Sequence, residues 1–322
     1  MLIILPPSES KTAGGQPGPV AVDQLAFPGL APTRKRLLST LEAMGQSFLA
    51  AQEALAGASA PQEAAEEKIR ALDTMIGIRA TQHAEHESNA AVASSELLPA
   101  VERYTGVAYD ALDPTGQRTG RPLTADARAR LAIGSALFGV IAADDLIPRY
   151  RLSAGSKVFV DGEARTLRSQ WTKPAKGNRI GEELARWRED RAADTDGAGG
   201  GIIDLRSGGY RDLGKIPGAV SLRVESEYPD GSRKVVSHFN KHYKGLVARE
   251  LALAGGHLPA DPESTGELAE AFAHRIGEVA AFVDANFRTE VHDPGEVTLI
   301  VPAEYAASPS PVSSARKPRP SP

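Results

Sequence analysis

The sequence predicts an α/β fold with α+β character, a single compact domain in which helices flank a mixed β-sheet. The apolar run Leu2–Leu5 is typical of a short buried strand. Residues 33–84 carry apolar side chains at helical spacing, interrupted near 57–61. The segment Pro229–Gly231 is a hairpin signal between two strand-like segments. A hairpin requires an antiparallel pair, so the sheet is expected to be mixed rather than purely parallel.

The composition places the chain among ordinary globular proteins. Of its 322 residues, 41% are hydrophobic and 24% are charged, which is enough to build a sizeable core. The absence of cysteine excludes disulfides, thiol catalysis and cysteine-ligated metal centres. Neither a signal peptide nor an apolar run long enough to span a membrane is evident, so we expect a cytoplasmic protein without a membrane partner. The net charge of −4 argues against an overall basic surface but permits a local basic cluster.

The first strand ends abruptly, because Pro6 and Pro7 lack the N–H groups that a sheet needs. The polar residues Ser8 and Lys11 follow directly. In open α/β sheets, ligands bind at the carboxyl ends of the strands, so this loop is a candidate site. Lys11 could act as the base for Ser8, or it could bind a phosphate or carboxylate, which we favour. The alternative is an ordinary strand exit with a capping serine and a solvated lysine.

Further elements are expected along the rest of the chain. A helical layer covers approximately residues 33–90, and residues 128–137 form a helix or strand leading into 138–141. Residues 180–191 form a charged amphipathic helix.

The C-terminal part alternates strands and helices. Strands are expected at 202–205, 219–224, 234–239 and 297–301, and helices at 241–253 and 268–287. We place the domain at residues 1–305 and a disordered tail, rich in serine and proline, at 306–322.

Basic residues cluster between positions 233 and 249, a stretch that contains no acid. The cluster comprises Arg233, Lys234, His238, Lys241, His242, Lys244 and Arg249. On a helix, Lys241 and Lys244 would share a face, and Gly245 would allow a close backbone approach, which suits a phosphate. A solvated helix face is the alternative.

Several tyrosines lie in loop-like segments. Arg149-Tyr150-Arg151 could bind a phosphate and stack a base, or Tyr150 could belong to the core. Tyr104, Tyr109 and Tyr210 could serve recognition or proton donation, although buried hydroxyls tied to the backbone are the commoner explanation.

Two histidines invite a metal interpretation. His83 and His86 would share a helix face, but no third ligand is evident. We predict no metal site and no cofactor.

Six segments in order resemble one family. They are Met1–Thr12, Tyr104–Asp113, Phe138–Leu152, Trp171, Asp204–Tyr210 and Lys241–Gly245. Together they resemble the YaaA family of peroxide-stress proteins. The resemblance implies a compact α/β domain with a positively charged cleft and a helix-hairpin-helix-like element, and a DNA-binding role in limiting peroxide and iron damage. Some members carry an acid beside the serine of the fifth segment, where this chain has Gly208-Gly209.

Two functions remain open. The first is a DNA-binding protein that engages phosphates through Lys11, Arg149, Tyr150, Arg151, Lys241 and Lys244. The second is an enzyme acting on a nucleotide, nucleobase or damaged DNA, with Ser8, Lys11, Tyr104, Asp113, Ser207 and Tyr210 as candidate catalytic residues.

Overall fold

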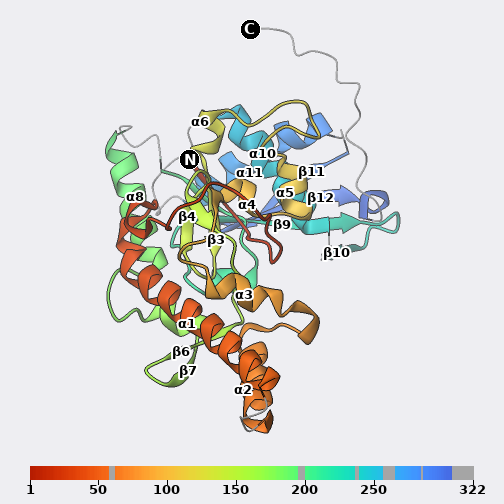
Figure 1. The fold of residues 1–322 in the computed structure, drawn as a ribbon. Helices are drawn as coiled ribbons and strands as arrows, with labels where there is room; N and C mark the ends of the chain where they lie inside the picture. Colours follow the sequence, from red (N-terminus) through yellow and green to blue (C-terminus); the bar gives the residue numbers. More distant parts are fainter. Residues whose placement is uncertain (58–61, 195–199, 236–238, 257–264, 284–285, 307–322) are drawn as a thin grey trace.

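A mixed β-sheet of eight strands forms the centre of the molecule (Figure 1). The computed structural model describes residues 1–57, 62–194, 200–235, 239–256, 265–283 and 286–306. The strands follow the order β11-β12-β9-β8-β1-β3-β4, with β10 paired to β9. Their bounds are β1 (Leu2–Leu5), β3 (Leu131–Ser135), β4 (Gly139–Ala142), β8 (Ile202–Asp204), β9 (Val220–Glu227), β10 (Arg233–Val235), β11 (Arg288–Asp293) and β12 (Glu296–Pro302).

The sheet confirms the predicted mixed α/β class. Its centre is parallel, since β1 pairs in parallel with both β3 and β8, and β9 pairs in parallel with β8 and β12. Antiparallel pairs occur at β3–β4, β9–β10 and β11–β12. All of β1 is buried, as expected for a strand covered on both faces.

Two C-terminal helices pack against this sheet. Helix α10 (Phe239–Ala254) contacts β1 and β9, and α11 (Thr265–Val283) contacts β11 and β12. The predicted strand 234–239 was too long, because β10 ends at Val235 and Phe239 already belongs to α10. His238 lies outside the described residues. The predicted helix 268–287 also ran too far, because α11 ends at Val283 and Phe287 lies in the segment before β11.

A helical arm extends from the sheet (Figure 1). It contains α1 (Ala31–Ala56), α2 (Gln62–Ile76) and α3 (Ala84–Ala90), which pack on one another and occupy the predicted helical layer. The arm is anchored by Arg34, a fully buried residue of α1. Its guanidinium donates hydrogen bonds to the carbonyls of Phe138 and Val140, at 2.9 and 2.6 Å. Since these carbonyls belong to the β3–β4 hairpin, the arm is fixed to the sheet.

Several short elements have no clear periodicity in the sequence. They are β2 (Leu97–Pro99), β5 (Leu146–Pro148), β6 (Lys157–Val160), β7 (Glu163–Thr166), α4 (Ala100–Arg103), α5 (Val107–Leu112), α6 (Ala125–Arg128), α7 (Leu167–Thr172) and α9 (Gly208–Arg211). Because three to six residues span too few periods to establish a pattern, the sequence did not reveal these short elements.

The predicted amphipathic helix is α8 (Ile180–Asp194). In the described part of the chain, no helix is both long and apolar enough to cross a membrane.

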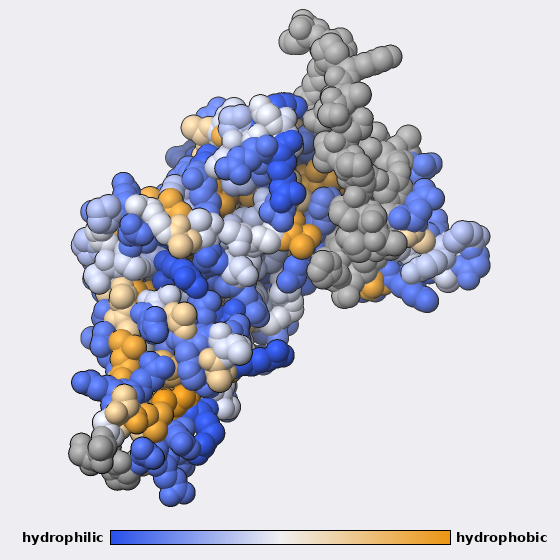
Figure 2. All heavy atoms as spheres, turned by 45° about the vertical axis from the view of Figure 1, so that its right-hand side comes forward, coloured by the Kyte–Doolittle hydropathy of each residue, from blue (hydrophilic) through white to orange (hydrophobic). Residues whose placement is uncertain are grey.

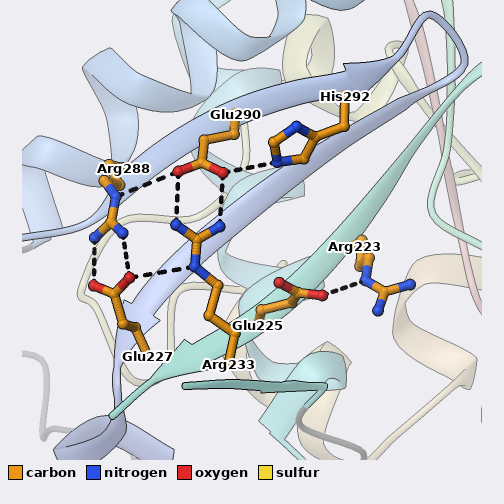
Figure 3. A network of polar contacts seen from close by, with 7 residues as sticks. All are labelled: Arg223, Glu225, Glu227, Arg233, Arg288, Glu290 and His292. Carbon is orange, nitrogen blue, oxygen red and sulfur yellow. Dashed lines mark hydrogen bonds and ion pairs between the residues drawn. The ribbon is translucent and has the colours of Figure 1, made fainter. Parts of the chain in front are cut away.

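An ion-pair network covers the outer strands of the sheet (Figure 3). Arg233 of β10 contacts Glu290 of β11 at 2.7 Å and Glu227 of β9 at 3.2 Å. Arg288 contacts both Glu227 and Glu290, and His292 lies 2.8 Å from Glu290. The network therefore links strands that are not direct neighbours in the sheet.

Candidate functional site

The candidate site lies where the strand order changes direction. After β1 the chain continues to β3 on one side, and β8 later pairs on the other side of β1. All three strands are parallel, so their carboxyl ends lie on the same side of the molecule. Ligands of open α/β proteins bind at the carboxyl ends of strands at such a switch point. The loop Pro6–Lys11, which the sequence singled out, follows the carboxyl end of β1.

Ser8 fixes the conformation of this loop. Its hydroxyl donates to the Ser10 carbonyl at 2.6 Å and accepts from the Thr105 amide at 3.1 Å. The Tyr109 hydroxyl donates to the Pro6 carbonyl at 3.0 Å. The Thr105 amide and the Tyr109 side chain both come from the segment around α5, so this segment packs against the loop after β1.

Lys11 places its ammonium over two aromatic rings. Nζ lies 4.2 Å from the ring centroid of Tyr150 and 5.1 Å from that of Tyr104. It donates to the backbone carbonyls of Ser8 and Glu9, both at 3.3 Å. Lys11 is half-buried, and its backbone forms an isolated β-bridge with Tyr104. The lysine thus reaches inward from the loop to the tyrosines.

The charges around Lys11 are nearly balanced. The pKa of Lys11 is lowered to about 7, first by burial and then by the Arg151 charge, whereas Glu85 and Glu9 oppose this shift. Arg149 contributes in the same direction as Arg151. A large fraction of this amine is therefore neutral near pH 7, unlike that of a solvated lysine.

A chain of hydroxyl groups lies beneath the lysine. Tyr104 and Tyr150 hydroxyls are 2.7 Å apart, and the Tyr150 hydroxyl is also 2.7 Å from Ser135 Oγ. Ser135 Oγ accepts a hydrogen bond from the Phe138 amide at 3.0 Å. Burial raises the pKa of both tyrosines, so they remain protonated and can donate hydrogen bonds. Three hydroxyls from β3 and two loops thus form one connected path.

The arginines beside Tyr150 are paired with acids. Arg151 contacts Glu9 at 2.9 Å, and Arg149 contacts Glu85 at 3.2 Å. The Arg151 side chain is 9% exposed, whereas that of Glu9 is 67% exposed. Tyr150 itself is buried in the core, as the structural alternative predicted, so its ring is not a surface on which a base could stack.

The two predicted phosphate-binding lysines of α10 differ in exposure. Lys241 is exposed, whereas Lys244 is buried, and its ammonium donates to the Leu205 carbonyl at 3.0 Å. Burial lowers the pKa of Lys244 to about 8, against the charge of Asp204. Lys244 therefore supports the loop after β8 and is not exposed for phosphate binding.

Gly245 allows a close approach, but of another helix. A Cβ at this position would lie 2.0 Å from the Ala108 carbonyl of α5. The glycine therefore serves the α5–α10 contact.

An ion pair organises the loop after β8. Arg206 binds Asp204 with Nε to Oδ1 at 2.8 Å and Nη2 to Oδ2 at 2.9 Å, and both residues are buried. Nη2 of Arg206 also donates to the Gly214 carbonyl at 2.9 Å. The arginine crosses Gly134 of β3, where an added Cβ would lie 2.5 Å from Arg206 Cδ. This pair fixes the segment that carries Ser207 and Tyr210.

Tyr210 belongs electrostatically to the Lys11 site. Burial raises its pKa to about 12, the Ala154 backbone lowers it, Glu9 raises it and Arg151 lowers it. Ser207 is exposed and precedes α9.

Asp113 is committed to a separate loop. Its carboxylate accepts hydrogen bonds from the Thr119 amide and hydroxyl, at 2.8 and 2.7 Å, and from the Arg118 amide at 3.2 Å. Burial raises the pKa of Asp113, but these hydrogen bonds and the Arg249 charge outweigh burial and lower it overall. The described contacts of Asp113 are thus those of a loop-stabilising carboxylate.

Sequence reasoning missed Ser135 and Glu9. Ser135 ends an otherwise apolar strand, and Glu9 lies within the motif but was assigned no role. Only the pairing of β1 with β3 brings Ser135 to the site.

The two histidines share one carboxylate. His83 and His86 Nε2 lie 3.0 and 2.9 Å from the two oxygens of Asp73. The His86 ring stacks on Phe48 at 4.0 Å between centroids. These contacts join α1, α2 and α3, and among the described residues no cluster suited to a metal ion occurs.

A hollow lies on the helical arm, away from the Lys11 site. It is a groove of about 410 Å³ between α1, α2 and β6, bordered by Met44, Leu72 and Phe159. Figure 2 shows hydrophobic residues gathered on this part of the surface. The groove contains none of the residues of the Lys11 site.

The fold and the site define an α/β protein with a polar site at the switch point of a mixed sheet. The profile of the family described as "Peroxide stress protein YaaA" matches residues 1–262. A UPF0246 protein of Corynebacterium efficiens is 42% identical over 271 residues, covering 84% of this chain and 91% of its own. One from Corynebacterium glutamicum is 44% identical over 255 residues, covering 79% and 86%.

A more distant relative has similar coverage. A UPF0246 protein of Streptomyces coelicolor is 33% identical over 287 residues, covering 87% of this chain and 92% of its own. The chain therefore belongs to the peroxide stress protein YaaA family, which confirms the resemblance found in the sequence and supports a general role in stress response.

Proposed function

We propose that this protein acts in the peroxide-stress response as an enzyme on damaged DNA or its nucleotide components, with Lys11 at the reacting centre. The observation that carries the proposal is the position of the Lys11 amine above the Tyr104–Tyr150–Ser135 hydroxyl chain. An amine with a pKa of about 7 beside protonated hydroxyls can accept and donate protons near neutral pH. A protein that only neutralises phosphates needs none of these groups.

Binding of DNA without chemistry is the second candidate function. It is supported by the exposed Lys241 and by the half-buried Arg149 at one side of the site. The Arg151–Glu9 pair also favours it, because the exposed Glu9 could be replaced by a phosphate. Such a protein would protect DNA from iron-dependent damage by covering it. The helix-hairpin-helix-like element and the basic cleft stay predictions.

Two measurements separate these functions. Fluorescence anisotropy with labelled single- and double-stranded DNA, at two salt concentrations, tests binding by the wild type, Lys241→Ala and Arg149→Ala. Lys68→Ala is the matched control, since Lys68 is an exposed lysine on α2 of the arm. We expect affinity to fall with salt and in the two site variants but not in the control. Failure of the wild type to bind at low salt would exclude the binding function.

The enzyme function is tested by turnover. Wild type and Lys11→Arg are incubated with oligonucleotides that carry oxidised bases or abasic sites and with nucleotides, and products are separated by electrophoresis and chromatography. We expect product with the wild type only. Equal DNA binding with no product from any substrate would favour the binder.

A further inference from the structure

The Lys11 amine has surroundings that differ from those of a structural lysine. The described residues place no carboxylate within ion-pair distance of Nζ, and its two hydrogen bonds go to backbone carbonyls at 3.3 Å. The residue as a whole is half-buried, and its amine lies between the loop carbonyls and the two aromatic rings. By comparison, Lys244 is buried and bound at 3.0 Å to a carbonyl that it supports. The Lys11 amine is therefore held in place by backbone carbonyls and not by an ion pair.

From this geometry we propose that Lys11 is a nucleophile that forms an imine with an aldehyde carrying a phosphate group. The inference rests on the proposed function and names its substrate class. Amines held in desolvated sites near other cations are the ones that form Schiff bases in proteins, and here Arg151 and Arg149 are the neighbouring cations.

The condensation needs no reagent that the site lacks. The neutral Lys11 nitrogen attacks the carbonyl carbon, a C–N bond forms, and a proton moves from nitrogen to the carbonyl oxygen. The C–O bond then breaks, the hydroxyl leaves as water with one more proton, and the nitrogen lone pair forms the C=N bond. Nothing is oxidised or reduced. Solvent supplies the proton that accompanies departure of water, because the raised pKa values of Tyr104 and Tyr150 keep their hydroxyls protonated.

The aromatic rings favour the product. The protonated imine carries the same positive charge as the ammonium, and it would occupy the position now 4.2 Å from the Tyr150 ring centroid. A cation over an aromatic face is stabilised by the ring quadrupole. The site therefore accommodates both a neutral attacking amine and a cationic imine.

Arg151 is the group that would bind the phosphate of the proposed substrate. Its guanidinium is 9% exposed, whereas its partner Glu9 is 67% exposed, so the acid lies at the rim and the cation lies inside. A phosphate can take the place of the Glu9 carboxylate and accept two hydrogen bonds from the guanidinium. Free sugar phosphates and the ring-opened deoxyribose of an abasic site in DNA both present this combination of aldehyde and phosphate.

Reductive trapping tests the inference on the full chain. The wild type is incubated at pH 7 with deoxyribose 5-phosphate, with unphosphorylated deoxyribose, or with an oligonucleotide containing an abasic site. Cyanoborohydride is then added, and the modified lysine is identified by peptide mass spectrometry. We expect adducts on Lys11 at least about tenfold above those on Lys68, because the neutral fraction of a solvated lysine is far smaller at this pH. Deoxyribose should react less, and inorganic phosphate should compete.

Variants provide the second readout. Lys11→Arg places a long cationic side chain at this position but cannot form the imine, so trapping should disappear, whereas Lys68→Arg should retain it. Thermal unfolding checks that Lys11→Arg is folded, and the site mapping on the wild type stands even if it is not. Adducts spread evenly over exposed lysines would overturn the inference.

The different substrates of the trapping experiment also separate the inference from the proposed function. Trapping of the sugar phosphate at Lys11 without binding or trapping of DNA would uphold the imine and reject the role on DNA. Trapping of the abasic oligonucleotide would support both. DNA binding or turnover with no aldehyde trapped at Lys11 would uphold the proposed function and reject the imine.

Discussion

The Lys11 ammonium lies 4.2 Å from the centre of the buried Tyr150 ring, with the lysine contributed by the loop after β1 and the tyrosine by the segment after β5. Two opposing influences meet at this contact. Burial and Arg151 favour the neutral amine, whereas the aromatic face favours the ammonium. The protonation state of Lys11 is therefore sensitive to what occupies the site.

Lys11 should titrate far below solvated lysines. Its pKa is lowered from 10.5 to about 7 by burial, with a contribution from Arg151. In protein with ¹³C-labelled lysine, NMR should show a Cε signal that titrates near pH 7 and is lost in Lys11→Met, beside the Lys244 signal near pH 8.

The same shift makes stability depend on pH. Between about pH 7 and 10.5 the unfolded chain holds a proton that folded Lys11 has lost, so stability rises with pH over this window. Urea unfolding of Lys11→Met should lack this contribution. A Lys11 signal that moves together with the solvated lysines would refute both expectations.

Breaking the Asp204–Arg206 pair should cost more than removing it. Arg206→Met leaves the buried Asp204 carboxylate without its main partner, and we expect a loss of about 3–5 kcal/mol. The double variant Asp204→Asn, Arg206→Met carries no buried charge from this pair and should be more stable than the single variant. Urea denaturation of all three proteins measures the difference. Equal stability of the single and double variants would show that the carboxylate finds compensation elsewhere.

Gly245→Ala should destabilise the fold through the α5–α10 contact. The new Cβ would lie 2.0 Å from the Ala108 carbonyl, which forces the helices apart and costs about 1–3 kcal/mol. Gly266→Ala is the matched control, because a Cβ there meets open space in α11 and should raise stability by up to about 1 kcal/mol. Guanidinium unfolding of the two variants should therefore give opposite signs. A neutral Gly245→Ala would mean that α5 can move without cost.

The outer ion-pair network should fail in acid. The Arg233 hydrogen bond, with contributions from His292, lowers the pKa of Glu290 from 4.5 to about 2. A carboxylate with a lowered pKa contributes stability above pH 4.5, and this contribution is lost as the pH falls towards 2. Because the pair is exposed to solvent, we expect this contribution to the free energy of unfolding to be small.

Glu290→Gln should flatten the stability profile between pH 5 and 2, measured by thermal unfolding in buffers of low salt. Glu67→Gln, an exposed position on α2, serves as the control. The same profile in both variants would show that the network contributes nothing measurable.

Asp113 should behave as a structural residue. It adopts a left-handed conformation, with φ of 45°, and accepts hydrogen bonds from the loop that follows. Asp113→Ala removes these bonds, so limited proteolysis between residues 114 and 121 should accelerate. Asp113→Asn should have a smaller effect, because asparagine tolerates this conformation and keeps one acceptor oxygen. If Asp113→Asn abolished turnover while the loop stayed protected, Asp113 would belong to the chemistry instead.

Local sequence signals predicted most of the long elements. The apolar run of β1, its stop at Pro6-Pro7 and the hairpin at Pro229–Gly231 each depend on a few adjacent residues, and the structure contains all three. The helices of the arm and α10 have enough turns to display a helical period. The pair β2–β5 shows no such local signal, because its two strands come from distant parts of the chain. The pair β6–β7 is a local hairpin, and its Asp161-Gly162 turn is a hairpin signal that was missed in the sequence.

The candidate site was only partly predictable. Lys11 stood out because it follows a buried strand, and the exposed position of Lys241 agrees with the helical pattern. Lys244 looked equivalent to Lys241 in sequence, yet it is buried against the loop after β8. Helical periodicity says which residues share a face, but it does not say what packs against that face.

The sequence by itself determined the fold class, the place where β1 stops and the family. Tertiary structure alone decided that Lys11, Tyr104, Tyr150 and Ser135 meet, although they span residues 11 to 150. It also decided that Arg151 pairs with Glu9 and that Asp113 stabilises a loop. The physical reason is that strand stops and helical periods are set by neighbouring residues, whereas a parallel sheet brings together the ends of strands that are far apart in the chain.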